Sequence, residues 1–136
     1  MRKILSGLFA LVLVFSIGLT GCSADTASST DGLTGNYRQD TLALISDLRA
    51  AINLPSDAPD KVAAEAEAKR MINTFASRYR RDSSVDTLSS FTTVRTALNA
   101  LAGHYSSYPN RPIPQKLKTR LEQEFKQAEA ALRRES

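Results

Sequence analysis

The sequence predicts an all-α protein, an antiparallel up-down-up-down four-helix bundle. Four stretches of the chain carry apolar residues three or four positions apart, which is the spacing of one face of a helix. The connections between these stretches are short and contain proline, and no stretch of useful length alternates as a β-strand does. Four amphipathic helices joined by short connections pack most economically as a bundle.

The N-terminus precedes this bundle and has the pattern of an export signal. A cationic start, Met1 to Lys3, is followed by the mostly apolar residues 4–17 and then by "LTGC" at 19–22. A charged start, an apolar run of about 7–15 residues and small residues at a cleavage point are typical of a secretory signal peptide. The tetrad resembles a bacterial lipobox, in which the cysteine is alkylated with diacylglycerol and becomes the new N-terminus. We therefore predict that residues 1–21 are removed and that Cys22 is lipidated. The alternative is an ordinary signal peptide beside an incidental cysteine.

The remaining chain is predicted to form one domain behind a tether. Residues 22–35 are small and polar, as in a flexible linker, and residues 36–136 would form the bundle. Cys22 is the one cysteine, so the monomer has no internal disulfide. The net charge of the whole chain is +4, and two of the positive charges lie in the predicted signal peptide. This mild charge argues against a nucleic-acid partner, and we expect a monomer.

The first helix is predicted over residues 37–53. Asn36 and Gln39 are spaced as in a capping box, and Pro55 would end the helix. Its inner face is predicted to consist of Tyr37, Thr41, Leu44, Ile45, Leu48, Ala51 and Ile52.

The second helix is predicted from about Pro59 to Arg80, since proline is favourable in a first turn. Its inner face is predicted to consist of Val62, Ala66, Ile72, Phe75, Ala76 and Tyr79. Glu65 and Lys69 are spaced to form an ion pair on the outer face.

The third and fourth helices are predicted over residues 87–105 and 114–134. Gly103 and the following "SSYPNRPIP" are expected to end the third helix. The inner face of the third helix would contain Leu88, Phe91, Val94, Leu98, Leu101 and Ala102, and that of the fourth Leu117, Leu121, Phe125, Ala128, Ala131 and Leu132.

The residues available for catalysis are few. His104 is the one side chain whose ordinary pKa lies near neutrality, and it is expected to cap the third helix or to be a partly buried hydrogen-bonding group. Contact with a partner and ligation of a metal or pigment are the alternatives. A metal site would need several converging ligands, and the sequence has no nucleophile, zinc or phosphate-loop motif. We therefore predict no enzyme, no cofactor and no metal site.

Two stretches are candidate partner-binding surfaces. The stretch "RYRRD" at the end of the second helix supplies Arg78, Arg80, Arg81 and Asp82. The arginines would either interact with the helix dipole or pair with carboxylates of a partner. In residues 103–114 the candidates are His104, Tyr105, Tyr108, Asn110 and Arg111, because Tyr and Arg are enriched in binding hot spots. The alternative for this second stretch is a connection stiffened by prolines. In an up-down bundle the two stretches lie at opposite ends.

These stretches carry a family resemblance. "YRRDSSVDTLSSFTTVRTALNALAGHYSSYPNRPIPQKLKTRLEQE" at 79–124, "GNYRQDTLALISDLRAAI" at 35–52 and the lipobox strongly resemble the cyanobacterial photosystem II assembly and repair lipoproteins. The resemblance implies a non-enzymatic protein on the lumenal side of the thylakoid membrane, anchored by lipid on Cys22. Plant relatives lack this anchor, so Cys22 favours a cyanobacterial source.

The resemblance also implies what the protein binds. Such proteins bind photosystem II assembly intermediates transiently, chiefly at lumenal loops of the inner chlorophyll-binding antenna protein. They are thought to keep extrinsic subunits away and to leave the manganese site open for assembly. The alternative from another class is a membrane-tethered carrier of a small molecule, pigment or metal, which would need an internal cavity with converging polar groups.

Overall fold

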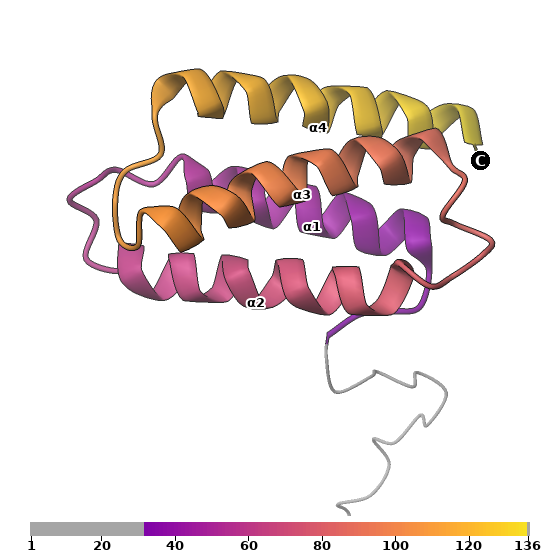
Figure 1. Cartoon of the computed structure of the whole chain (residues 1–136), viewed down its shortest axis with the longest axis horizontal. Coiled ribbons are helices and arrows are strands. Elements are labelled where there is room, and N and C mark those ends of the chain that lie inside the picture. Colours follow the sequence, from indigo (N-terminus) through magenta and orange to yellow (C-terminus); the bar gives the residue numbers. More distant parts are fainter. Residues whose placement is uncertain (1–31, 136) are drawn as a thin grey trace, which may run out of the picture.

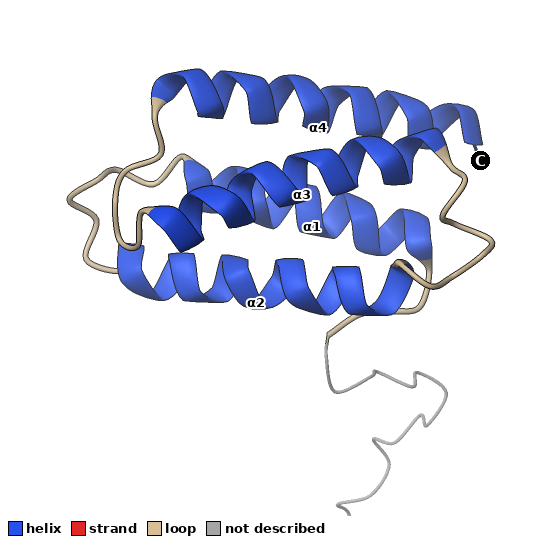
Figure 2. Ribbon diagram, viewed as in Figure 1, coloured by secondary structure: helices blue, strands red, loops and turns tan. Residues whose placement is uncertain are grey.

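The computed structural model describes residues 32–135, which form four helices. They are α1 (Tyr37–Ile52), α2 (Lys61–Tyr79), α3 (Ser89–Ser107) and α4 (Gln115–Glu135). This part of the chain contains no strand (Figure 2). The predicted all-α four-helix bundle is therefore confirmed, with helix ends within two residues of their predicted positions. The predicted signal peptide, Cys22 and the first part of the linker lie outside the described residues.

Consecutive helices run in opposite directions, so the loops alternate between the two ends of the bundle (Figure 1). The α1–α2 and α3–α4 loops lie at one end. The α2–α3 loop lies at the other end, together with the residues that lead into α1 (Figure 1). The helix pair α3 and α4 packs most extensively. Small buried residues, Ala97 on α3 and Ala128 and Ala131 on α4, allow the two helices to approach closely.

Aromatic rings fill the core near the α2–α3 end. The ring centroids of Phe75 and Tyr79 lie 4.9 Å apart, and Tyr37 contributes a third ring 5.4 Å from Tyr79. Phe91 of α3 completes the group, with its centroid 6.4 Å from that of Tyr37. Val85 of the α2–α3 loop is also buried and covers this end of the core. It was not predicted as a core residue.

Helix α1 follows the sequence prediction closely. The side chain of Asn36 accepts a hydrogen bond from the Gln39 amide at 3.0 Å, so Asn36 is the N-cap. Most of the predicted inner face is buried, and Tyr37 and Ala51 are half-buried. The buried residues of that predicted face are Thr41, Leu44, Ile45, Leu48 and Ile52.

The predicted inner face of α2 is partly wrong. Val62 is 62% exposed and Ala66 is also exposed, whereas Glu65, which was assigned to the outer face, is only 5% exposed. The buried residues are Glu65, Ala68, Ile72, Phe75 and Tyr79, a regular helical spacing. A charged residue therefore occupies a position on the inner face, and the contacts that stabilise it come from a distant loop.

Gly103 does not end α3, which continues to Ser107. A glycine inside a helix is unfavourable by about 1 kcal/mol relative to alanine. Here Tyr105, two residues before the end of the helix, is buried in the core, and this packing stabilises the helix beyond the glycine. Tertiary contacts therefore outweigh the low helix propensity of Gly103.

Replacing Gly103 with alanine is expected to stabilise the protein by about 0.5–1 kcal/mol. The residue is helical, and a Cβ atom built on it would have no heavy atom within 4 Å. Urea denaturation of wild type and Gly103→Ala measures the change. A destabilised Gly103→Ala variant would show that the end of α3 does not remain helical in solution.

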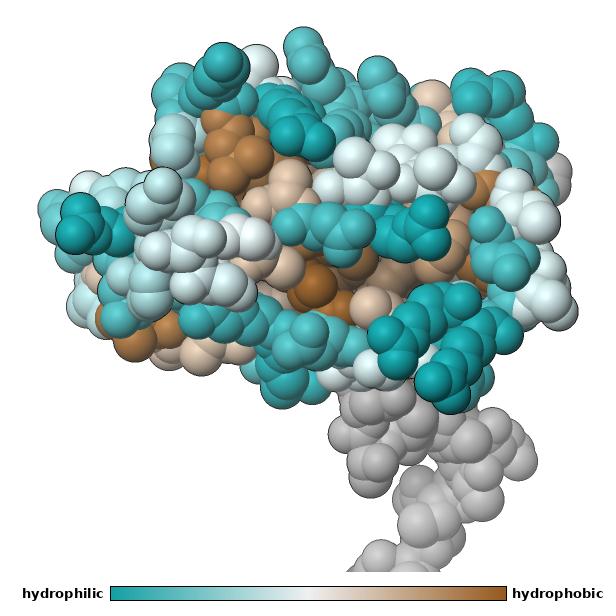
Figure 3. All heavy atoms as spheres, in the orientation of Figure 1, coloured by the Kyte–Doolittle hydropathy of each residue, from teal (hydrophilic) through white to brown (hydrophobic). Residues whose placement is uncertain are grey.

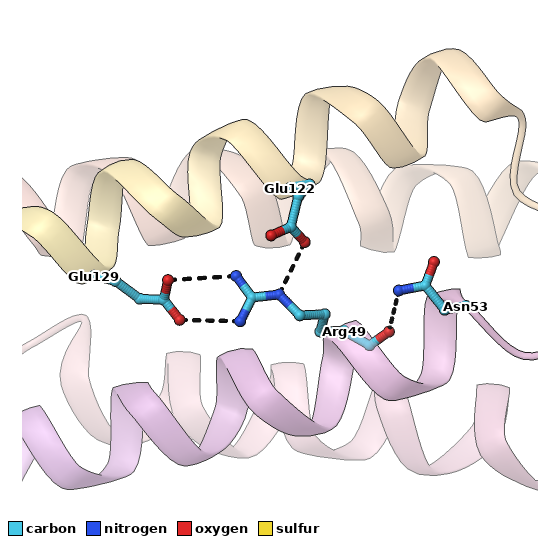
Figure 4. A network of polar contacts seen from close by, with 4 residues as sticks. All are labelled: Arg49, Asn53, Glu122 and Glu129. Atoms are coloured by element: carbon cyan, nitrogen blue, oxygen red, sulfur yellow. Dashed lines mark hydrogen bonds and ion pairs between the residues drawn. The ribbon is translucent and has the colours of Figure 1, made fainter.

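Arg49 of α1 ties this helix to α4 (Figure 4). Its Nε lies 2.8 Å from Glu122 Oε2, and its Nη1 lies 3.0 Å from Glu129 Oε1. The guanidinium group also lies over the ring of Phe125, 5.7 Å from the centroid. The hydrogen bonds to Glu122 and Glu129 raise the pKa of Arg49 above its ordinary value. Because all three charged side chains are partly exposed, each ion pair contributes about 0.2–1 kcal/mol.

The end of α4 caps α3. The N-cap residue Leu88 has no side chain that can accept a hydrogen bond from the helix. Instead the Glu135 carboxylate accepts from the Ser90 amide at 3.0 Å and from the Ser90 hydroxyl at 2.5 Å. The same hydroxyl lies 2.7 Å from the Tyr37 hydroxyl, so this group joins α1, α3 and α4.

The surface is largely hydrophilic. On the face drawn in Figure 3, apolar residues reach the surface only in separate places between polar side chains. Among the described helices, none combines the length and apolar character needed to cross a bilayer.

Candidate functional site

The arginine-rich stretch lies at the α2–α3 end of the bundle. Arg78, Arg80 and Arg81 are exposed, and Asp82 is half-buried. Asp82 Oδ1 accepts hydrogen bonds from the Ser84 amide at 2.9 Å and the Ser84 hydroxyl at 2.5 Å, which lower the pKa of Asp82. Its carboxylate therefore stabilises the turn after α2. Arg80 and Arg81 form no ion pair within residues 32–135, so both are available to a partner.

A buried carboxylate lies at the same end. Asp40 accepts hydrogen bonds from the Thr34 amide at 2.8 Å, the Thr34 hydroxyl at 2.6 Å and the Gly35 amide at 3.1 Å. The Tyr79 hydroxyl also donates to it. Burial acts to raise the pKa of Asp40, but these hydrogen bonds outweigh it and hold the pKa below its ordinary value. Burial and the nearby Asp40 raise the pKa of Tyr79.

Asp40 therefore holds residues 34 and 35, which were predicted to belong to the linker, against the bundle. Gly35 has a φ of 86°, a conformation that favours glycine. A Cβ atom there would lie 3.3 Å from Arg78 Nη2. Asp40 was not among the site residues predicted from the sequence, although its position beside Thr41 on the inner face of the helix was a signal.

The second candidate stretch lies at the opposite end, as the topology predicted. Tyr105 is only 3% exposed and belongs to the core, so it is not a surface contact. Burial, with a smaller effect of the Glu65 charge, raises its pKa to about 12. Tyr108 is 57% exposed and its ring lies 5.4 Å from that of His104. His104 Nε2 is buried and forms no hydrogen bond within the described chain.

Glu65 holds the α3–α4 loop in place. The Asn110 amide lies 3.2 Å from Glu65 Oε2 and 3.3 Å from Oε1. Asn110 has a φ of 58°, a conformation that asparagine tolerates better than most residues. Lys69 Nζ lies 3.3 Å from Glu65 Oε1, so the predicted ion pair forms, although on the inner side of α2. The neighbouring Arg111 is exposed.

The two loops at this end enclose a pocket of about 250 Å³. Its apolar walls include Ile52 and Leu54 from the α1–α2 side and Ile113 from the α3–α4 loop. Glu65 and Tyr105 also line it. Three cations complete the lining, namely Lys61, Arg111 and Lys118.

The described residues offer no group of three or more His, Cys, Asp or Glu side chains that could hold a metal ion. Leu48, Leu101 and Phe125 are among the side chains that fill the centre of the bundle. No observation on residues 32–135 therefore favours the carrier over a protein that acts through its surface.

Comparisons with known proteins identify the family. The model of the family described as Photosystem II Pbs27 matches residues 4–132. The chain belongs to this family. The assembly factor lipoprotein Psb27 of photosystem II from Thermosynechococcus vestitus is 59% identical over 136 residues, covering 100% of this chain and 98% of the relative. The photosystem II lipoprotein Psb27 from Synechocystis is 53% identical and covers 98% of this chain and 96% of the relative. The photosystem II repair protein PSB27-H1 from Arabidopsis thaliana is 37% identical over 72% of this chain and 57% of the relative.

Solved Psb27 structures have the same fold. The solution structure of cyanobacterial Psb27 has a TM-score of 0.73 and 54% identity, and covers 81% of this chain and 96% of its own. The crystal structure of PSB27 from Arabidopsis thaliana has a TM-score of 0.70 and 37% identity, and covers 74% of this chain and 98% of its own. These solved chains match over nearly their whole length but over only part of this chain, so the Psb27 bundle folds in chains shorter than this one.

The family resemblance inferred from the sequence is thus confirmed. The Psb27 family consists of non-catalytic assembly factors, so the chain is not an enzyme. Both cyanobacterial relatives are lipoproteins by name.

Proposed function

We propose that this chain is a lipid-anchored factor for photosystem II assembly and repair. It binds transiently to immature photosystem II on the lumenal side of the thylakoid membrane, chiefly at loops of the inner chlorophyll-binding antenna protein. While bound, it keeps extrinsic subunits away and leaves the manganese site open. The match over the full chain with a cyanobacterial assembly factor lipoprotein carries this proposal.

The anchor in this proposal is lipid on Cys22. A multiply acylated cysteine holds a protein stably on a membrane, whereas one acyl chain gives marginal binding. Such an anchor raises the effective concentration of the bundle near its partner. Release from photosystem II then leaves the protein on the membrane, ready for another cycle.

The surface residues available for binding lie at both ends of the bundle. Arg80 and Arg81 are exposed and unpaired within the described residues, and Tyr108 and Arg111 are exposed in the α3–α4 loop. Arg and Tyr are frequent binding hot spots. A small, partly polar interface of this kind suits reversible binding.

Co-purification from solubilised cyanobacterial thylakoids, with the native gene deleted, tests the proposal. The tagged protein is expected to recover the inner antenna protein with immature photosystem II, and Cys22→Ser is expected to leave the membrane fraction. Arg80→Ala/Arg81→Ala and Tyr108→Ala/Arg111→Ala each test one end of the bundle. Lys126→Ala/Arg134→Ala is the control that removes two positive charges, as Arg80→Ala/Arg81→Ala does. If the wild type recovers no photosystem II subunit, the proposal is wrong.

A further inference from the structure

We propose that the pocket between the α1–α2 and α3–α4 loops binds an acidic peptide segment, one that carries a carboxylate next to an aliphatic side chain. The proposal rests on the proposed function, because it assigns a docking site to a protein partner. It concerns the end of the bundle that is remote from the arginine-rich stretch (Figure 1).

The charge of the pocket favours a carboxylate. Lys61, Arg111 and Lys118 line it, and none of them forms an ion pair within residues 32–135. The one lining carboxylate, Glu65, is already engaged by the Asn110 amide and by Lys69. The three cations are therefore not neutralised locally, and they attract an anionic group of a partner.

The shape and walls of the pocket favour a peptide over a free anion or a cofactor. Its volume of about 250 Å³ is below the range of about 300–1,000 Å³ usual for small-molecule sites, so it accommodates side chains and not a pigment. Ile52, Leu54, Pro55, Pro112 and Ile113 give it apolar surface that a small hydrated anion would not use.

The loop that carries Arg111 is positioned by buried contacts. The Glu65 carboxylate holds the Asn110 amide, and Tyr105 is packed beneath the loop. This arrangement fixes one wall of the pocket before the partner arrives, which reduces the entropy lost on binding. Glu65 is thus a positioning residue for the site.

An NMR titration tests the site directly. The ¹⁵N-labelled chain from Ser23 onward is titrated with a ten-residue peptide that alternates Glu and Leu, and with the matched peptide that has Gln in place of Glu. We expect the acidic peptide to shift the amides of Lys61, Asn110, Arg111 and Lys118, and salt to weaken this binding. The Gln peptide is expected to bind about tenfold more weakly.

Charge reversal supplies the matched comparison. Lys61→Glu/Lys118→Glu is expected to weaken binding of the acidic peptide about tenfold, whereas Lys126→Glu/Arg134→Glu changes the net charge equally at residues that do not line the pocket and leaves binding unchanged. Circular dichroism verifies folding, and Lys61→Gln/Lys118→Gln replaces the reversal variant if that variant does not fold. Three results would each overturn the proposal. They are equal binding of both peptides, chemical-shift changes centred on Arg80 and Arg81, and identical shift changes with acetate or inorganic phosphate alone.

The thylakoid co-purification separates this proposal from the proposed function. If wild type and Lys61→Glu/Lys118→Glu recover photosystem II equally, the pocket is not the docking site and the proposed function stands. If the wild type recovers no photosystem II subunit, the proposed function fails, and the titration still decides whether the pocket binds acidic peptides.

Discussion

Replacing Phe75 with alanine is expected to lower the free energy of unfolding by about 3–5 kcal/mol. Phe75 is 1% exposed and lies at the centre of the aromatic group formed with Tyr37 and Tyr79. Its removal loses buried apolar area and leaves a cavity between helices that cannot collapse independently. Because native domains are stable by about 5–15 kcal/mol in total, Phe75→Ala brings the bundle close to unfolding.

Guanidinium denaturation of the chain from Ser23 onward, followed by circular dichroism, measures this change. Val62→Ala is the control on the same helix, since Val62 is largely exposed and its truncation is expected to cost less than about 0.5 kcal/mol. Equal effects of the two substitutions would show that α2 packs with a different face inward.

Replacing Asp40 with asparagine is expected to lower the free energy of unfolding by about 2 kcal/mol at pH 7. The carboxylate accepts hydrogen bonds from Thr34, Gly35 and the Tyr79 hydroxyl in a buried position. An amide of the same size has one oxygen acceptor and no charge, so some of these donors lose their partner. Amide hydrogen exchange at Thr34 and Gly35 is expected to become faster in Asp40→Asn.

The effect of Asp40 depends on pH in a direction set by its pKa. The folded protein holds this pKa below its ordinary value, near 3.9 in an unfolded chain, so the carboxylate stabilises the fold above about pH 4. This contribution is lost as the pH falls through the lowered pKa. The difference between wild type and Asp40→Asn should therefore shrink below about pH 4. Asp47→Asn, an exposed change on the same helix, should show no such trend; a constant Asp40→Asn difference down to pH 2 would contradict the assignment.

Much of the fold could be predicted because each helix is determined largely by residues that are close together in the sequence. The apolar spacing of α1, α3 and α4 and the Asn36 cap are properties of short stretches of sequence, and the structure follows them. The error in α2 has a different origin. Glu65 is buried because an amide 45 residues away in the sequence and Lys69 stabilise its charge. No local pattern contains that information.

The same limit applies to the candidate site. The candidates were chosen by residue type, and four of them are exposed, namely Arg80, Arg81, Tyr108 and Arg111. Residue type could not distinguish these from Tyr105, which is buried in the core. The pocket was not predicted because its lining comes from all four helices and two loops, and only packing brings Lys61, Arg111 and Lys118 together.

The attachment of Thr34 and Gly35 to Asp40 determines how the bundle would be presented to the membrane. The ten residues from Cys22 to Asp31 span at most about 35 Å when fully extended, and α2, with 19 residues, is about 28 Å long. With lipid on Cys22, the anchored segment would join the bundle beside Arg78, at the end that carries the arginines. The lysine-lined pocket lies at the opposite end of the bundle, so its greatest distance from the bilayer surface would be roughly 60 Å. Because the chain attaches near the start of α1, the two ends of the bundle would differ in their greatest distance from the membrane.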